Sequence, residues 1–174
     1  FSKYAYVRAT FETSQMLSSV GHPSNTLEDD DFDDNVLREQ YQIPIKHGKK
    51  IPGISPHIGR FGLGYAYKKN WTFSADIEAS SSQFYRGDED NTAGLKLPGH
   101  ILTNVGTEYN FSMGDKFRAG ANGTFFLTAR NIFGVNYETG GIFAENEVSG
   151  TGGSGTFVTP GQPRVIFAGV NVTW

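Results

Sequence analysis

The sequence predicts an all-β protein whose antiparallel strands cross a membrane as part of a β-barrel, and three observations support that prediction. Apolar and polar residues alternate with a period of two along several segments, the pattern of strands with one apolar face. Most of these segments are as long as the roughly 9–11 residues that a tilted strand needs to cross a bilayer. Long and short connections also follow one another in turn, as in outer-membrane barrels.

The alternation predicts six strands, and the strongest signal lies at residues 71–79. Its odd positions are apolar and its even positions polar: Trp71, Phe73, Ala75, Ile77 and Ala79 against Thr72, Ser74, Asp76 and Glu78. The other five segments are 1–11, 61–67, 101–111, 124–133 and 166–174. From Phe61 to Ala79 we therefore expect odd-numbered side chains to face lipid and even-numbered ones to face the barrel lumen.

The connections between these segments alternate in length. In chain order they are a long polar connection at 15–56, a tight turn at 68–70, a medium loop at 85–100, a compact turn at 113–123 and a long Gly-rich connection at 134–163. Barrels have short periplasmic turns and longer extracellular loops, so we place the long connections outside. Aromatic residues gather at both strand ends, as in the two girdles of a barrel: Tyr67, Trp71, Tyr109, Phe111 and Trp174 at one end, Phe61, Phe84, Tyr85, Phe133 and Tyr137 at the other.

Composition excludes several other classes of protein. The net charge of −3 gives no basic face for nucleic acid. The chain has no cysteine, which excludes disulfides and cysteine metal sites. No apolar run approaches the roughly 18 residues of a membrane helix. Because no serine, histidine and acid combination forms a nucleophilic set, we predict that the chain is not an enzyme, and we expect no cofactor.

Six strands cannot stand alone in a membrane, because both terminal strands would expose unpaired backbone groups to hydrocarbon. We therefore expect residues 1–174 to be one segment of a larger barrel, a fragment or a processed product that other strands complete.

Two further sets of side chains are candidates for metal binding. An acidic run in the first long connection consists of Asp29, Asp30, Asp31, Asp33 and Asp34. Calcium prefers clustered carboxylates, but the run lacks the spacing of an EF-hand, and we interpret it as a solvated loop. The four histidines, at positions 22, 47, 57 and 100, have no ligand-like spacing, so we predict no metal site.

Five short motifs lie at residues 51–57 (IPGISPH), 84–91 (FYRGDEDN), 97–100 (LPGH), 129–137 (ARNIFGVNY) and 160–164 (PGQPR). In this order and spacing they resemble the C-terminal barrel segments of TonB-dependent outer-membrane receptors. The resemblance covers nearly the whole chain. It implies that residues 1–174 are the last six strands of a 22-stranded barrel in the bacterial outer membrane. The family's usual Asn-Leu-Phe-Asp is Asn131-Ile132-Phe133-Gly134 here, a small departure.

The resemblance also implies a function and partners. Such receptors take up scarce nutrients, typically siderophores or other metal chelates, and TonB energises them through a plug domain that is not in this chain. In a receptor, the charged tip beside Tyr85 can contact substrate, which makes Tyr85, Arg86 and Asp88 candidate ligand contacts; the simpler interpretation is an ordinary surface loop. The C-terminal Gly169-x-x-Val172-x-Trp174 resembles the signal read by the barrel assembly machinery, although Ala168 stands where a polar residue is usual.

Two other functions stay open at this stage. One is a self-standing outer-membrane barrel with a structural, adhesive or enzymatic role, which a complete gene without a plug would favour. The other is a secreted carbohydrate-binding β-sandwich, which would bury its aromatic face against a second sheet and dissolve without detergent.

Overall fold

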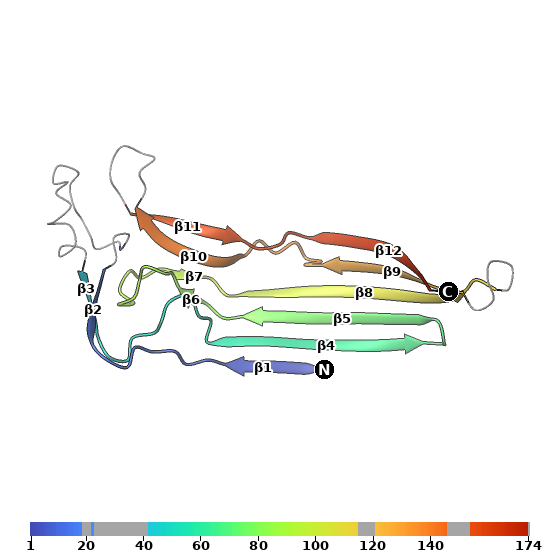
Figure 1. The fold of residues 1–174 in the computed structure, drawn as a ribbon, viewed down its shortest axis with the longest axis horizontal. Helices are drawn as coiled ribbons and strands as arrows, with labels where there is room; N and C mark the ends of the chain where they lie inside the picture. The colour runs from blue at the N-terminus through green and yellow to red at the C-terminus, as the bar shows by residue number, and fades with distance from the viewer. Residues whose placement is uncertain (19–21, 23–41, 115–120, 146–153, 174) are drawn as a thin grey trace.

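The computed structural model describes residues 1–18, 22, 42–114, 121–145 and 154–173, and within them every regular element is a β-strand. Six strands form one antiparallel sheet in the order β1-β4-β5-β8-β9-β12 (Figure 1). They are β1 (Ser2–Tyr6), β4 (His57–Tyr67), β5 (Trp71–Ser80), β8 (His100–Ser112), β9 (Asn122–Arg130) and β12 (Val165–Thr173). The predicted all-β fold with a six-stranded antiparallel sheet is confirmed. No helix in the described part of the chain is long and apolar enough to cross a membrane.

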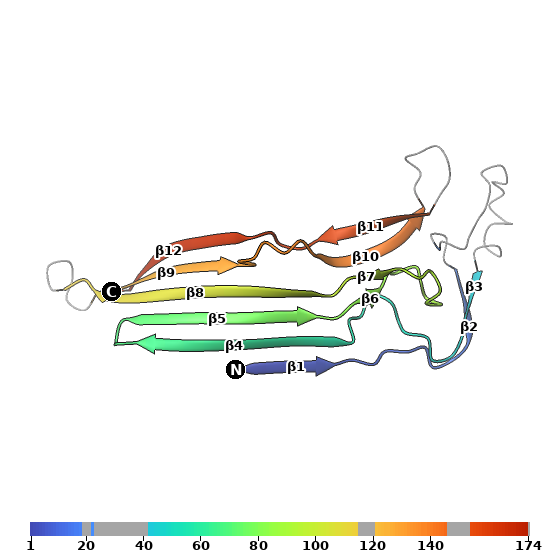
Figure 2. The ribbon, with the colours of Figure 1, turned by 180° about the vertical axis from the view of Figure 1, so that it is seen from behind.

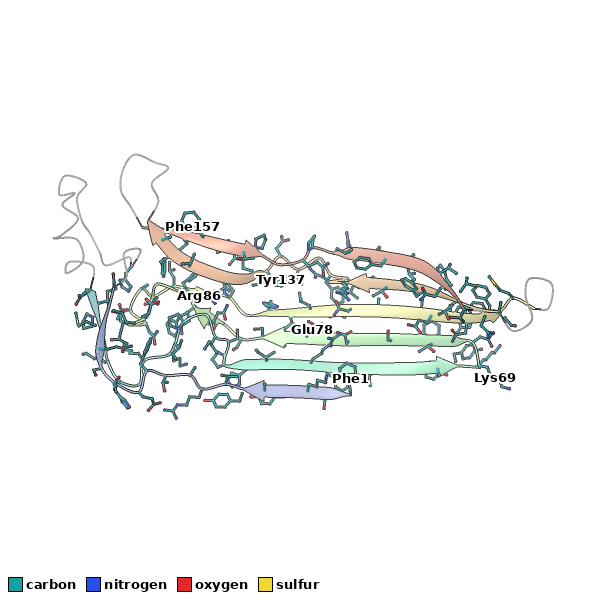
Figure 3. All side chains as sticks on the ribbon, in the orientation of Figure 1. Phe1, Lys69, Glu78, Arg86, Tyr137 and Phe157 are labelled. Atoms are coloured by element: carbon teal, nitrogen blue, oxygen red, sulfur yellow. The ribbon has the colours of Figure 1, made fainter. Side chains whose placement is uncertain are left out.

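The central strands have the length that a membrane crossing requires. β4, β5 and β8 contain 11, 10 and 13 residues, and a tilted strand needs about 9–11 residues to cross a bilayer. The predicted turn at residues 68–70 joins β4 to β5, and Lys68 has a positive φ of 55° there. Lys69 lies at this end of the molecule, opposite the end that carries Arg86 and Phe157 (Figure 3).

The register places apolar side chains side by side on one face of the sheet. Phe61 pairs with Ile77, and Leu63 pairs with Ala75. Leu63 is 65% exposed, so this face has no protein cover in the described structure. Near the β4–β5 turn, the rings of Trp71 and Tyr109 lie 4.7 Å apart, within the aromatic group predicted for this end. The alternation expected from Phe61 to Ala79 is therefore present in the sheet.

The first strand is shorter than predicted. Regular pairing with β4 ends at Tyr6, whereas the sequence pattern extended to residue 11. Residues 7–11 instead make scattered backbone hydrogen bonds with residues 48–56, such as Val7 N–H to Pro56 O at 2.9 Å. Two prolines in that partner segment, Pro52 and Pro56, have no N–H to donate, so a continuous ladder cannot form.

Three hairpins lie beyond the other end of the sheet (Figure 1, Figure 2). They pair β2 (Gln15–Ser18) with β3 (Gln42–Ile45), β6 (Gln83–Phe84) with β7 (Lys96–Leu97), and β10 (Glu138–Glu145) with β11 (Ser154–Pro160). The connections expected at 15–56 and 134–163 therefore contain paired strands, and the one expected at 85–100 contains β7, which pairs with β6 just before it. Tyr85, Leu97 and Phe143 form the buried apolar cluster of this region.

Two glycines let aromatic rings lie close against the backbone on the polar face of the sheet. The ring of Phe1 occupies the space that a Cβ on Gly62 would need, and the ring of Phe126 does the same at Gly169. Gly169 lies directly opposite Phe126 across the β9–β12 pair. Each glycine thus allows a cross-strand ring to cover the backbone, as aromatic side chains do when they shield a glycine in a strand.

Candidate functional site on the polar face of the sheet

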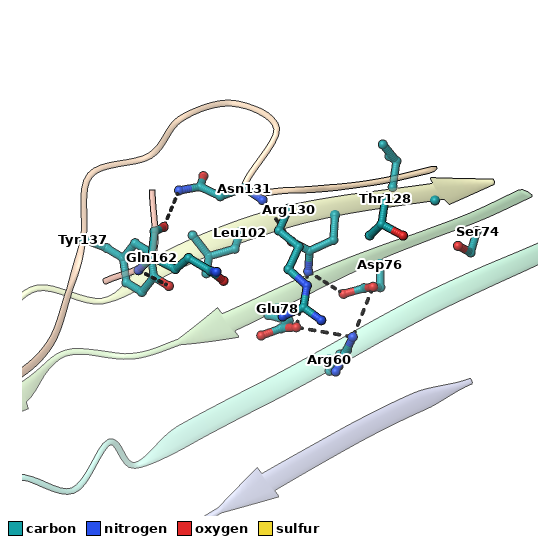
Figure 4. Close-up of a pocket in the computed structure, with 13 residues that line it drawn as sticks. Arg60, Ser74, Asp76, Glu78, Leu102, Thr128, Arg130, Asn131, Tyr137 and Gln162 are labelled. Carbon is teal, nitrogen blue, oxygen red and sulfur yellow. Dashed lines mark hydrogen bonds and ion pairs between the residues drawn. The ribbon is translucent and has the colours of Figure 1, made fainter. Parts of the chain in front are cut away.

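An ion-paired cluster lies on the polar face, where β4 meets β5. Arg60 Nη2 is 3.2 Å from Asp76 Oδ1 and 3.4 Å from Glu78 Oε1 (Figure 4). The register explains the contact, because Arg60 lies directly opposite Glu78 in the β4–β5 pair. The Arg60 side chain is 49% exposed, so the pairs orient the side chains and contribute no more than about 1 kcal/mol each.

Asn104 on β8 extends this cluster to a third strand. Its Nδ2 donates to Asp76 Oδ2 at 2.9 Å and to Glu78 Oε1 at 3.3 Å. Its Oδ1 accepts the backbone N–H of Asn131 at 3.0 Å. One amide side chain therefore connects the carboxylates of β5 to the end of β9.

Asn131 ties the connection that follows β9 to the start of β12. Its Nδ2 donates to the carbonyls of Val135 at 2.9 Å and Gln162 at 3.2 Å, and its Oδ1 accepts the Val135 N–H at 2.9 Å. The residue is buried and has φ = 50°, a left-handed conformation that asparagine tolerates better than most residues. These bonds satisfy the whole amide in the interior, where an unpaired polar group would be costly.

The cluster lines a hollow of about 330 Å³ on the polar face (Figure 4). Its polar lining comes from β4, β5, β8, β9 and the residues beyond β9: Arg60, Ser74, Asp76, Glu78, Asn104, Thr128, Arg130, Asn131, Tyr137 and Gln162. Arg130 lies over the ring of Phe167 at 5.9 Å, as Arg60 lies over Phe1 at the same distance. Because both charge signs occur and many of the groups bond to one another, the face suits contact with another polar surface.

The three predicted ligand contacts lie in the hairpin region rather than on this face. Tyr85 is buried against Phe143, with the ring centroids 5.2 Å apart, and burial followed by the charge of Glu138 raises the pKa of its hydroxyl. Asp88 is fully buried. Arg86 is exposed, while its backbone N–H donates to Gly141 O at 3.0 Å. The structure thus leaves Arg86 as the accessible member of the three, and their contact with a substrate stays a prediction.

Two residues of the predicted assembly signal, Gly169 and Val172, lie on the edge strand β12. Gly169 is covered by the ring of Phe126, and Val172 pairs with Gly123 and is 39% exposed on the apolar face. Trp174 lies outside the described residues, as does the acidic run from Asp29 to Asp34. The structure therefore gives Gly169 a packing role that the motif did not indicate.

Sequence patterns missed two sets of residues that the structure brings together. Asn131 appeared only within a motif, and its link to Asn104 depends on the path of the chain after β9. His22, which we set aside as a metal ligand, lies against Asp88 and Asp90. The histidine and the aspartates are too far apart in sequence for any spacing rule to connect them.

Comparison with known proteins relates this geometry to a family. The family described as TonB dependent receptor-like, beta-barrel matches residues 1–132. Among solved structures, the ferric citrate transporter FecA in its unliganded form is similar at 24% sequence identity with a TM-score of 0.50. The match covers 73% of this chain and 18% of FecA, so the chain corresponds to less than a fifth of that transporter. No curated protein matches the chain. At this identity the likeness concerns the fold.

Proposed function

Because the chain belongs to the TonB-dependent receptor-like β-barrel family, we propose that it forms part of the wall of an outer-membrane receptor that imports a scarce nutrient. In this proposal residues 1–174 are the C-terminal segment of a 22-stranded barrel in the bacterial outer membrane. The nutrient is a siderophore or another metal chelate, for which the ferric citrate carried by FecA is one precedent. TonB supplies the energy through a plug domain outside this chain.

The main support is the contrast between the two faces of one sheet. Large apolar side chains on one face are exposed, including Leu63, Tyr65 and Ile166 at 63–65%. The other face carries the hydrogen-bonded network of Arg60, Asp76 and Asn104. A wide transmembrane barrel needs this division, because its outside faces lipid and its inside faces water or a plug.

The arrangement of the sheets argues against a β-sandwich. A sandwich needs a second sheet packed about 10 Å from the apolar face of the first. In the part of the chain that the structure describes, the small hairpins lie beyond the end of the six-stranded sheet and not across that face (Figure 1, Figure 2). The edge strands β1 and β12 each have one sheet neighbour here, which fits a barrel completed by further strands.

The direct test is uptake by the full-length receptor. Cells that lack their own receptors for iron chelates would express it, and import of labelled iron would be measured with ferric citrate and with a ferric hydroxamate. We expect import of at least one chelate, and we expect it to disappear when TonB is deleted. Import that persists without TonB, or an absence of import for both chelates, would favour the self-standing barrel instead.

The assembly signal is proposed on the same basis. Deletion of Trp174 should lower the amount of folded receptor in the outer membrane and leave uptake per folded molecule nearly unchanged. Heat-modifiable mobility on gels measures the folded amount, and uptake is then normalised to it. Normal folding with lost uptake would instead assign Trp174 to a plug or substrate contact.

A further inference from the structure

Three side chains that can bind a metal converge in the hairpin region. His22 follows β2, whereas Asp88 and Asp90 lie in the loop between β6 and β7. His22 Nε2 is 3.1 Å from Asp90 Oδ1 and 3.7 Å from Asp88 Oδ1, and one ligand atom from each residue lies within 4.8 Å of the others. Atoms bound to one ion at about 2.0–2.2 Å lie within about 4.4 Å of each other, and both distances from His22 Nε2 to the carboxylates meet this limit.

The loop orients both carboxylates before any ion binds. Asp88 Oδ1 accepts the backbone N–H groups of Thr92 at 2.8 Å and Ala93 at 3.1 Å. Asp90 accepts the Thr92 hydroxyl at 2.7 Å. Such hydrogen bonds from outside the ligand set hold metal-binding carboxylates in place and tune their affinity.

One buried oxygen remains without a hydrogen-bond donor. Asp88 is 0% exposed, and its Oδ2 has no hydrogen-bond partner in the described structure. A buried carboxylate oxygen beside a second carboxylate requires either a proton or a cation, because an uncompensated charge in the interior is very costly.

We propose that His22, Asp88 and Asp90 bind a divalent transition-metal ion of the zinc class. The imidazole nitrogen decides between cations: Ca²⁺ and Mg²⁺ take oxygen ligands, whereas nitrogen together with carboxylate oxygen suits Zn²⁺ and its neighbours. Three protein ligands leave a further position for water. The bound ion neutralises the two carboxylates, including the buried carboxylate of Asp88.

The ion would fasten two long connections to each other. Its ligands come from the connection between β1 and β4 and from the one between β5 and β8. The same two connections already share a reciprocal contact, in which Lys50 N–H donates to Asn91 Oδ1 at 2.8 Å and Asn91 Nδ2 donates to Lys50 O at 3.0 Å. The metal is therefore a structural element of the hairpin region and is independent of the nutrient that the receptor transports.

The test uses the full-length receptor, folded in detergent and without a histidine tag, after treatment with a chelator. Calorimetric titration with Zn²⁺ should reveal a site that His22→Ala and Asp90→Asn each weaken by at least about tenfold, the lower end of what even indirect changes cost a metal site. His47→Ala and Glu12→Gln are the controls, since they remove an imidazole and a carboxylate charge from exposed side chains outside the three ligands. We expect both to bind Zn²⁺ like the parent.

Two further measurements exclude the alternatives. Co²⁺ in place of Zn²⁺ should give visible absorption bands that His22→Ala abolishes, and Ca²⁺ in large excess should not displace it. Equal Zn²⁺ binding by the parent and both ligand variants would overturn the proposal. Displacement by Ca²⁺ would overturn the assignment to a transition metal. An unchanged melting temperature after chelation, together with stabilisation by Asp88→Asn, would show that a proton occupies the site.

Discussion

The six-stranded sheet and the hairpin region differ in the exposure of some of their large apolar side chains. On the sheet, Leu63 and Ile166 are each 65% exposed. In the hairpin region beyond its end, Leu97 and Phe143 are 2% and 5% exposed and pack against Tyr85. The sheet leaves its apolar face uncovered, whereas the hairpin region also buries a cluster of apolar side chains in its interior, as a soluble domain does.

The difference shows which solvent each region is built for. An uncovered apolar face along strands of 10 to 13 residues is stable where the surroundings are hydrocarbon. A small buried cluster is what a segment needs when water surrounds it. The effect of a substitution on stability should therefore depend on what surrounds the side chain, and four variants of the full-length receptor test this.

The largest effect is expected inside the hairpin cluster. Phe143→Ala removes a ring that packs on Tyr85, and loss of a buried phenylalanine costs about 3–5 kcal/mol. Amide hydrogen exchange in β6, β7 and β10 should rise accordingly. Phe157→Ala is the control, since Phe157 on β11 is 47% exposed; equal acceleration by both would mean that the cluster is not a core.

On the sheet, the damaging change is a charge on the apolar face. Leu63→Arg should lower the free energy of unfolding from lipid vesicles by about 2–4 kcal/mol, the cost of an arginine facing mid-bilayer lipid. Glu108→Arg, which keeps a charge on the polar face of β8, should cost much less. Urea unfolding followed by fluorescence measures both, and the reverse ranking would show that the two faces are misassigned.

A smaller loss of stability is expected when the buried amide of Asn131 is removed. Asn131→Ala removes three hydrogen bonds and leaves groups such as the Val135 N–H without a partner, at a cost of about 1–3 kcal/mol. Asn136→Ala, in the same connection but exposed, should be nearly neutral. Comparable unfolding midpoints for the two variants would contradict a bracing role for Asn131.

The smallest effect is expected at the half-exposed ion pairs. Arg60→Gln should change the free energy of unfolding by less than about 1 kcal/mol, because solvent screens its contacts with Asp76 and Glu78. Added salt should then have little further effect on the variant. A loss several times larger would mean that a partner covers this face in the complete receptor.

Sequence reasoning succeeded where structure is local and periodic. A period of two identifies the strands and both faces of the sheet, because side chains alternate along every strand. It did not identify the hairpins, since β2, β3, β6 and β7 have four residues or fewer, and the sequences of β10 (ETGGIFAE) and β11 (SGTFVTP) do not alternate apolar with polar residues. His22 and Asp90 are 68 positions apart, and their meeting depends on how two long connections fold onto each other.

The rings of Phe1 and Phe126, which lie against Gly62 and Gly169, limit how this sequence can evolve. Any side chain at Gly62 would need the space that the Phe1 ring occupies, and the same holds for Gly169 and Phe126. In each pair the ring covers the backbone of the glycine, and the lack of a side chain on the glycine leaves room for the ring. We therefore expect the two members to be inherited together, so that relatives replacing one glycine also replace its aromatic partner.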